Sequence, residues 1–192
     1  MTNRPLLSVI IASTRSGRIG EAIATSFAER ARGEDYFDVE LVDLATVNLP
    51  IYDEPQQAVT RVYVHEHTRQ WSATIARSDA LVFVMPEYNH SFNAALKNAL
   101  DFLYHEWRDK PVGLVGYGGV SSGTRAMQAL KPVLLALKLA FAGEVAISTL
   151  TTPVVDGVFH GGERFERSAT TLLHELARLD APLRALRQAS KS

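Results

Sequence analysis

The sequence predicts an α/β protein in which helices cover both faces of one parallel sheet. Five short strand-like runs alternate with helical patterns, and this alternation is what parallel strand–helix–strand units produce. No repeat, low-complexity tract or interior linker divides the 192 residues, and the 46% apolar and 21% charged content is that of an ordinary globular chain. We therefore expect a single domain over residues 1–192, with residues 188–192 as a frayed tail.

The first half of the chain predicts two strands and two helices. The run Leu6–Ile11 is almost continuously apolar, as in a central parallel strand that is buried on both faces. A helix is expected over Gly20–Arg32. The next strand, Phe37–Leu44, alternates apolar with charged residues and is therefore expected to be more exposed. A loop rich in Pro, Asp and Asn, Asn48–Pro55, then leads to a second helix that ends near Ser78.

The second half continues the alternation. A third strand is predicted at Ala80–Val84, followed by a polar turn. Helical spacing after that turn is shown by Phe92, Ala95, Leu96, Ala99, Leu100 and Leu103. The fourth strand and helix are expected at Pro111–Val115 and Ser122–Leu139, and the fifth strand and closing helix at Val145–Leu150 and Phe165–Leu186.

The order of these elements restricts the topology. Crossovers between parallel strands are right-handed, and the usual arrangement for five such units is the flavodoxin-like three-layer α/β/α sandwich, with strand order 2-1-3-4-5. In that arrangement the loops after strands one, three and four surround one crevice at the carboxyl edge of the sheet. These three loops are therefore the candidate site.

The first of these loops predicts an anion site. It carries Ser13, Thr14, Arg15, Ser16, Gly17, Arg18 and Ile19, directly before a helix. Backbone N–H groups and the helix dipole favour an anion there, and hydroxyls and guanidinium groups add charge-assisted bonds. The loop lacks both G-x-G-x-x-G and G-K-[ST], so a phosphomonoester fits better than a diphosphate. The alternative is that the hydroxyls only cap the helix and the arginines are solvated.

The other two loops predict contacts with a flat ring. Pro86, Glu87, Tyr88 and Asn89 offer a fixed backbone, a stacking surface and hydrogen-bonding groups without evident proton-transfer machinery. The last loop carries Tyr117, Gly118 and Gly119, whose glycines let the main chain approach a ligand closely, or else serve only a turn with positive φ. Together the three loops describe a site for a mononucleotide with a large planar head, for which flavin mononucleotide (FMN) is the natural candidate.

Composition excludes several other chemistries. The chain has no cysteine, which rules out disulfides, thiolate nucleophiles and cysteine-held metals, so redox chemistry requires an imported cofactor. Six scattered histidines indicate no metal site. The net charge of −1 predicts no nucleic-acid partner, and no apolar run is long enough to span a membrane. The N-terminal residues lack the apolar core of a signal peptide, and a cytoplasmic location is expected.

Four segments resemble the NADPH-dependent FMN reductase family, which includes quinone, azo-dye and chromate reductases of flavodoxin-like fold. The segments are Ser13–Arg18, Pro86–Ser91, Ala95–Asp101 and Tyr117–Gly119, and the resemblance runs from the first strand to about Leu150. Two positions depart from the family pattern: Ala12 replaces the usual glycine, and Asn93 replaces a frequent proline.

The resemblance implies specific roles for the site residues. It implies an FMN phosphate held by Ser13, Arg15 and Ser16. It also implies an isoalloxazine ring lined by Pro86, Glu87, Tyr88 and Asn89, with Gly118 and Gly119 near its other edge. Family members are dimers or tetramers with the flavin near the subunit boundary, and the strongly apolar Val133–Leu137 segment is consistent with an interface.

The resulting functional hypothesis is an FMN-dependent oxidoreductase. Hydride passes from NADPH or NADH to FMN and then to a small-molecule acceptor such as a quinone, azo compound, free flavin or metal oxyanion, with ping-pong kinetics. Because the cofactor carries the chemistry, no catalytic side chain is predicted. One alternative is a non-catalytic flavoprotein that acts as an electron shuttle or a redox-responsive binding partner. Another is a phosphate-ester hydrolase on the same anion loop. The sequence does not name the acceptor, although Arg15 and Arg18 would favour the 2′-phosphate of NADPH.

Overall fold

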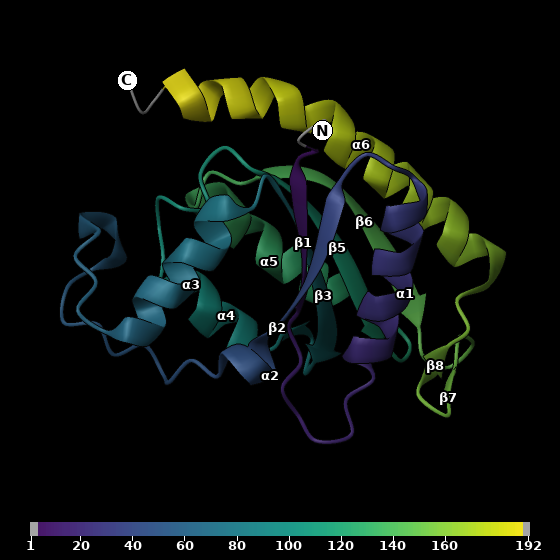
Figure 1. Ribbon diagram of the computed structural model, residues 1–192. Helices are drawn as coiled ribbons and strands as arrows, with labels where there is room; N and C mark the ends of the chain where they lie inside the picture. Colours follow the sequence, from purple (N-terminus) through teal and green to yellow (C-terminus); the bar gives the residue numbers. More distant parts are fainter. Residues whose placement is uncertain (1–3, 190–192) are drawn as a thin grey trace.

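The computed structural model describes residues 4–189 and has three layers, with the sheet between two layers of helices (Figure 1). The parallel strands follow the order β2-β1-β3-β5-β6, and the short β4 pairs antiparallel with β3. This is the predicted order of five parallel strands, so the expected flavodoxin-like sandwich is confirmed.

The bounds of the elements are as follows. The strands are β1 Leu6–Ile11, β2 Asp38–Asp43, β3 Ala80–Tyr88, β4 Ser91–Phe92, β5 Pro111–Gly118 and β6 Ala140–Ser148, with a separate hairpin of β7 Val154–Val155 and β8 Val158–Phe159. The helices are α1 Gly20–Gly33, α2 Leu44–Val47, α3 Glu66–Arg77, α4 Ala94–Asp101, α5 Thr124–Ala136 and α6 Gly162–Ala189, with a 3₁₀ turn, η1, at Ala58–Thr60.

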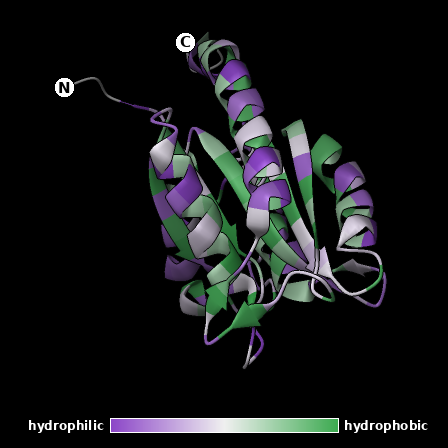
Figure 2. Ribbon diagram, turned by 90° about the vertical axis from the view of Figure 1, so that its right-hand side faces the viewer, coloured by the Kyte–Doolittle hydropathy of each residue, from purple (hydrophilic) through white to green (hydrophobic). Residues whose placement is uncertain are grey.

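Two hydrophobic cores hold the layers together, one on each face of the sheet. On one face α1 and α6 bury residues such as Phe27 and Leu173. On the other face the core contains the buried aromatic residues Trp71, Phe83 and Trp107 from α3, β3 and the segment after α4. Figure 2 shows apolar residues concentrated in the sheet and polar residues on the outer sides of the helices. Burial on both faces explains why β1, β3 and β5 are apolar runs in the sequence.

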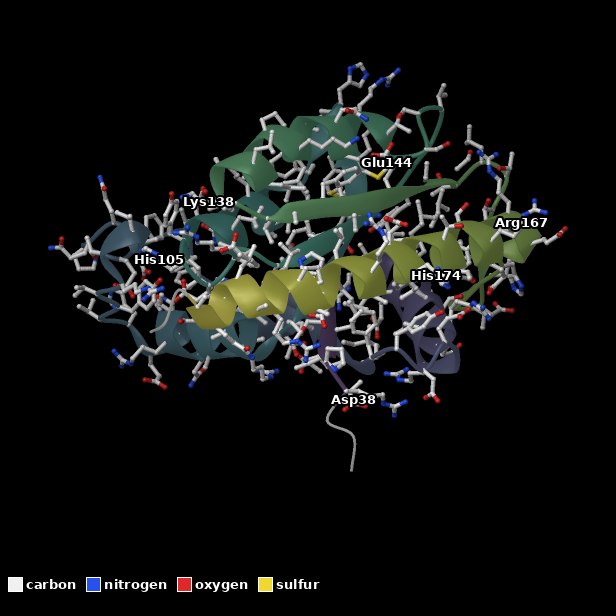
Figure 3. All side chains as sticks on the ribbon, turned by 90° about the horizontal axis from the view of Figure 1, so that it is seen from above. Asp38, His105, Lys138, Glu144, Arg167 and His174 are labelled. Atoms are coloured by element: carbon white, nitrogen blue, oxygen red, sulfur yellow. The ribbon has the colours of Figure 1, made fainter. Side chains whose placement is uncertain are left out.

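The long helix α6 runs across the sheet, and Arg167 projects from its first turns (Figure 3). Its close approach depends on two glycines, Gly113 of β5 and Gly143 of β6, which are paired across the strands. A Cβ atom at Gly113 would lie 2.8 Å from the Leu172 side chain, and one at Gly143 would lie 3.2 Å from it. The absence of these two side chains therefore makes room for Leu172.

Several elements are longer than their sequence patterns indicate. β3 and β5 continue to Tyr88 and Gly118 and so include part of the predicted loops, while β6 begins at Ala140. Pro86 is compatible with β3 because pairing with β1 has already ended at Val84, which leaves a local edge that needs no N–H donor.

The C-terminal part also differs from the sequence expectation. The β7–β8 hairpin was not predicted. Helix α6 includes residues 188 and 189, the first two positions of the expected tail, and residues 190–192 lie outside the described part of the chain.

Candidate functional site

The three predicted loops meet at the carboxyl edge of the sheet, which is the lower side of Figure 1. A pocket of about 190 Å³ lies between them. It is lined by Arg15, Arg18, Ile19, Pro86, Glu87, Tyr88, Tyr117, Gly118 and Thr149. The topology thus brings all three loops to one pocket, and it adds Thr149, which sequence reasoning missed. Thr149 directly follows β6, so the rule that ligands bind after parallel strands was the available signal.

The anion loop contains a buried hydroxyl group without a partner. Ser13 is fully buried, and its Oγ lies beside the Tyr117 hydroxyl but makes no hydrogen bond of normal geometry within residues 4–189. An unsatisfied buried polar atom costs about 1–3 kcal/mol, a cost that an anion bound at the start of α1 would remove. Thr14, Ser16 and Gly17 are exposed around it, and Gly17 has a positive φ of 69°. The loop therefore fits a phosphate group.

The two arginines of the anion loop have different environments. Arg18 is paired with Asp43 at the end of β2 and lies 3.6 Å from Glu21. Arg15 is exposed, and its guanidinium donates to the carbonyl of Ser16 at 3.2 Å. Since two carboxylates already compensate Arg18, Arg15 is the better candidate to bind an anion.

Tyr117 projects under the anion loop and packs beside Ser13. A Cβ atom at Gly20 would overlap Ser13 Oγ and lie 2.6 Å from Tyr117 Oη, so the glycine that opens α1 allows both hydroxyls to converge. Burial raises the pKa of Tyr117 to about 12, against the lowering effects of the neighbouring Ser13 hydroxyl and of the Arg15 and Arg18 charges. The phenol is therefore protonated at neutral pH.

The second loop, predicted as a polar turn, is a tight β-hairpin. Tyr88 pairs with Ser91 across β3 and β4, and the two residues between them, Asn89 and His90, have φ values of 49° and 68°. Two consecutive positive φ values are the mark of a type I′ turn, which matches the twist of the adjoining strands. The hairpin leaves the Tyr88 ring 39% exposed at the rim of the pocket, where it is available for stacking.

Glu87 is directed to the start of α5. Its side chain is only 7% exposed and accepts hydrogen bonds from Ser121 Oγ and from the Arg125 backbone N–H at 3.0 Å. Burial alone would raise the pKa of Glu87, but these bonds, the N–H of Ala126 and the Arg125 charge lower it overall. The carboxylate is therefore ionised and orients the α5 terminus, and it is not placed to transfer protons.

The glycines of the third loop serve different purposes. A Cβ at Gly118 would lie 3.2 Å from Glu87 Cβ, so that glycine is needed for packing against β3. A Cβ at Gly119 would meet no atom within 4 Å among residues 4–189. Gly119 is exposed, and its bare backbone leaves room for a flat ligand. The Thr149 N–H donates to the Gly118 carbonyl at 2.8 Å and so closes this loop against β6.

Two absences complete the description of residues 4–189. This part of the chain contains no group of three or more His, Asp or Glu side chains arranged to hold a metal ion. It also contains no helix with the length and apolar content required to cross a membrane.

Comparison with known proteins identifies relatives of this chain. Residues 5–152 match the model of the family described as NADPH-dependent FMN reductase. A curated relative, an NAD(P)H-dependent FMN reductase of Schizosaccharomyces pombe, is 42% identical over 166 residues, which are 85% of this chain and 82% of the relative.

Solved structures show the same fold. A flavoenzyme NAD(P)H:(acceptor) oxidoreductase of Paracoccus denitrificans superposes with a TM-score of 0.68 at 22% identity, over 94% of this chain and 98% of that one. A two-electron reduced flavodoxin of Megasphaera elsdenii superposes with a TM-score of 0.58 at 17% identity, over 90% and 98% of the two chains.

Proposed function

The chain belongs to the NADPH-dependent FMN reductase family, and from this premise we propose that it is an NAD(P)H-dependent oxidoreductase with FMN bound among the three loops. When bound, FMN supplies hydride transfer from a reduced nicotinamide to an oxidised small molecule. The protein binds and orients the cofactor, which explains why the pocket lacks a free acid–base pair.

Each loop has a role in this proposal. Ser13 Oγ, Arg15 and the N–H groups at the start of α1 bind the phosphate. The backbone of Pro86–Tyr88 and the Tyr88 ring line one side of the isoalloxazine, and the open backbone at Gly119 lies along another edge. Thr14, Ser16, Gly17 and Asn89 are exposed in the same two loops and remain candidate contacts.

The observation that carries the proposal is the unpartnered hydroxyl of Ser13. A hydroxyl that only capped α1 would be bonded to a backbone N–H of the first turn, and Ser13 Oγ makes no such bond. The Ser13 hydroxyl is not bonded to bulk water either, because the residue is fully buried.

The test is the affinity for FMN of two variants, Arg15→Ala and Ser13→Ala. A charge-assisted bond to phosphate contributes about 1.5–3 kcal/mol, so we expect Arg15→Ala to weaken FMN binding roughly 10- to 100-fold and Ser13→Ala to weaken it less. Quenching of flavin fluorescence measures both. Arg167→Ala, on the exposed side of α6, is the matched control.

Riboflavin provides a second control because it lacks the phosphate. Its affinity should be the same in the wild type and in Arg15→Ala. Unchanged FMN affinity in both loop variants would refute the phosphate assignment.

We further propose that donor and acceptor use the same face of the flavin in turn, which requires ping-pong kinetics. We expect parallel double-reciprocal lines when the concentration of NADH or NADPH is varied at several fixed concentrations of an acceptor. The acceptor is a quinone, azo compound, free flavin or metal oxyanion. Intersecting lines would contradict the proposal. Reduction by the nucleotide without reoxidation by any acceptor would instead indicate an electron shuttle. The homodimer and the cytoplasmic location also stay predictions.

A further inference from the structure

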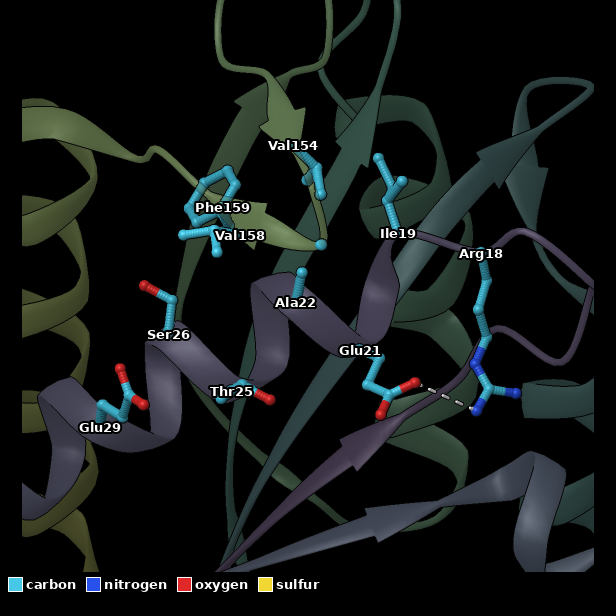
Figure 4. Close-up of a pocket in the computed structure, with 11 residues that line it drawn as sticks. Arg18, Ile19, Glu21, Ala22, Thr25, Ser26, Glu29, Val154, Val158 and Phe159 are labelled. Atoms are coloured by element: carbon cyan, nitrogen blue, oxygen red, sulfur yellow. Dashed lines mark ion pairs between the residues drawn. The ribbon is translucent and has the colours of Figure 1, made fainter.

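Two of the larger cavities outside the three loops differ in charge. A groove of about 500 Å³ between α1 and the β7–β8 hairpin carries Glu21 and Glu29, and its lining arginine, Arg18, is paired with Asp43 (Figure 4). A cavity of about 540 Å³ beside α3 has the opposite balance, with four cations against two carboxylates, and we call it the basic cavity. It is lined by Arg61, Ser72, Ala76, His105, Glu106, Arg108, Asp109, Lys110 and Arg187.

The basic cavity lies at the opposite edge of the sheet from the three loops. Asp109 and Lys110 directly precede β5. Arg187, near the end of α6, donates to Asp79, which directly precedes β3. Figure 3, which views the molecule from above, shows His105 on the same side as the C-terminal end of α6. A ligand in the basic cavity would therefore not compete with FMN.

Two of the four cations are already fixed in position. Lys110 is only 3% exposed, and its Nζ donates to the carbonyl of Ile75 in the last turn of α3. Arg187 donates to Asp79 Oδ1 at 3.1 Å and to the Asp109 carbonyl at 2.7 Å. Because the fold has ordered both long side chains, an anion that meets them loses little side-chain entropy on binding.

The other two cations are exposed and can turn toward a ligand. Among residues 4–189 the Arg61 guanidinium makes no hydrogen bond or ion pair. Burial and the neighbouring Glu106 raise the pKa of Tyr63, whereas the Arg61 charge lowers it, so Arg61 lies near this hydroxyl. Arg108 is half exposed and lies 3.2 Å from Asp109, and an ion pair of this kind contributes little in water.

The rest of the lining favours a hydrophilic ligand. Glu106 accepts hydrogen bonds from two neutral groups, Tyr63 Oη at 3.0 Å and Ser72 Oγ at 2.7 Å. The aliphatic surface of the lining is the methyl group of Ala76, so a flat apolar ring would gain little by burial there. An excess of positive charge in a polar cavity predicts an anion with several charged groups.

We propose that the basic cavity binds an oligophosphate chain, either free or as the phosphate chain of a nucleotide. Guanidinium groups bind phosphate oxygens in pairs, which makes arginine well suited to this ligand. The four cations come from the loop after η1, the segment before β5 and the end of α6, so linked phosphates can contact more of them than a single phosphate can. This site is additional to the proposed flavin chemistry and does not depend on it.

The first test measures the affinity for inorganic tripolyphosphate by calorimetric titration of the FMN-saturated protein, in which the anion loop is occupied. We expect Arg61→Gln and Arg108→Gln each to weaken binding about tenfold, the loss of one charge-assisted bond. Arg167→Gln, whose side chain is 71% exposed on α6, is the matched control and should bind like the wild type. Unchanged affinity in both cavity variants would overturn the proposal.

The second test predicts a gain of affinity, which damage to the fold would not produce. Glu106→Gln removes a negative charge from the lining and keeps an acceptor for Tyr63 and Ser72. We expect this variant to bind tripolyphosphate roughly threefold more tightly, because the repulsion between like charges is gone. Glu166→Gln, on the surface of α6, is the control. Equal or weaker binding by Glu106→Gln would contradict the proposal.

The third test identifies the ligand by chain length and by chemistry. Affinity should rise from phosphate to pyrophosphate to tripolyphosphate, and citrate, a compact tricarboxylate, should bind more weakly than tripolyphosphate. Equal affinity for the three phosphates, or for citrate, would overturn the assignment to an oligophosphate. ATP that binds like tripolyphosphate would identify the chain alone as the ligand, and tighter binding of ATP would identify a nucleotide as its source.

A final variant separates this site from the flavin site. Arg15→Ala should bind tripolyphosphate like the wild type, and dependence on Arg15 in place of Arg61 would put the anion in the loop after β1 and overturn the proposal. Failure of the proposed function would look different. In that case the protein would retain no FMN but would still lose affinity for tripolyphosphate in Arg61→Gln.

Discussion

Asn93 shows how a single side chain from a distant segment positions the anion loop. This residue is 5% exposed, and its Nδ2 donates to the Ala12 carbonyl at 2.6 Å, while the Ala12 N–H donates to Val84 at 2.9 Å. Both backbone groups of Ala12 are therefore bonded. Ala12 and Asn93 are the two positions that depart from the family pattern, and the structure places them in contact. Asn93 thus holds the start of the anion loop.

We predict that Asn93→Ala destabilises the protein and weakens FMN binding. The variant leaves the buried carbonyl of Ala12 without a donor, which costs about 1–3 kcal/mol. Urea unfolding and FMN titration measure the two effects. Asn93→Asp keeps the shape but places an acceptor opposite the carbonyl, so it should be at least as unstable. If both variants unfold like the wild type, the bond has no positioning role.

At the level of helices and strands, Glu87 connects the end of β3 to the start of α5. Its carboxylate accepts hydrogen bonds from Ser121 Oγ and from the backbone N–H of Arg125. It also lies 3.5 Å from the Arg125 guanidinium. The positive end of the α5 dipole adds to the stabilisation of this negative charge. Beyond the β3–β5 ladder, Glu87 therefore ties β3 to the loop after β5, and these are two sides of the candidate flavin pocket.

The lowered pKa of Glu87 makes its contribution depend on pH. A carboxyl group whose pKa is lower in the folded state stabilises the fold above its unfolded pKa, near 4.5, and loses that contribution as the pH falls through the folded value. We therefore expect Glu87→Gln to lower the free energy of unfolding by about 1–3 kcal/mol at neutral pH.

The measurement is denaturant unfolding of both proteins over a range of pH values. The difference between them should be constant from pH 6 to 8 and should shrink below about pH 4.5. Glu166→Gln, on the surface of α6, is the control. A difference that does not change with pH would show that the charge of Glu87 is not the source of the stability.

On the surface of the molecule, several apolar side chains are exposed along the long segment between β2 and α3. Ile51 is 90% exposed, and Val59, Val62 and Val64 are each about half exposed. Leu135 is 74% exposed in the segment that the sequence suggested as an interface, whereas Leu134 is buried. Clustered exposed aliphatic residues are typical of protein interfaces, so the segment 51–64 is the stronger candidate for contact with a second copy.

We predict a homodimer with twice the 21.1 kDa chain mass in sedimentation experiments. The double variant Ile51→Asp/Val62→Asp places charges in the segment 51–64 and should sediment as a monomer. Leu135→Asp should remain dimeric. A monomeric wild type would refute the prediction. If only Leu135→Asp dissociated the dimer, the interface would lie on α5. A mass four times that of the chain would indicate the tetramer.

Much of this architecture could be predicted because it depends on local pattern. The apolar runs at Leu6–Ile11 and Ala80–Val84, alternating with helical periodicity, determine a parallel sheet. Right-handed crossovers then bring the loops after particular strands to one edge, whatever the packing details. The Ser13–Arg18, Pro86–Asn89 and Tyr117–Gly119 segments were found for this reason, together with their family resemblance.

The partners of individual side chains depended on packing between distant segments. The pairing of Arg18 with Asp43, the docking of Glu87 on Arg125 and the bond from Asn93 to Ala12 join residues 25, 38 and 81 positions apart. Local periodicity carries no information about such contacts, because they form only when whole layers pack together. The same is true of the groove between α1 and the unpredicted hairpin, which exists only where the two elements face each other.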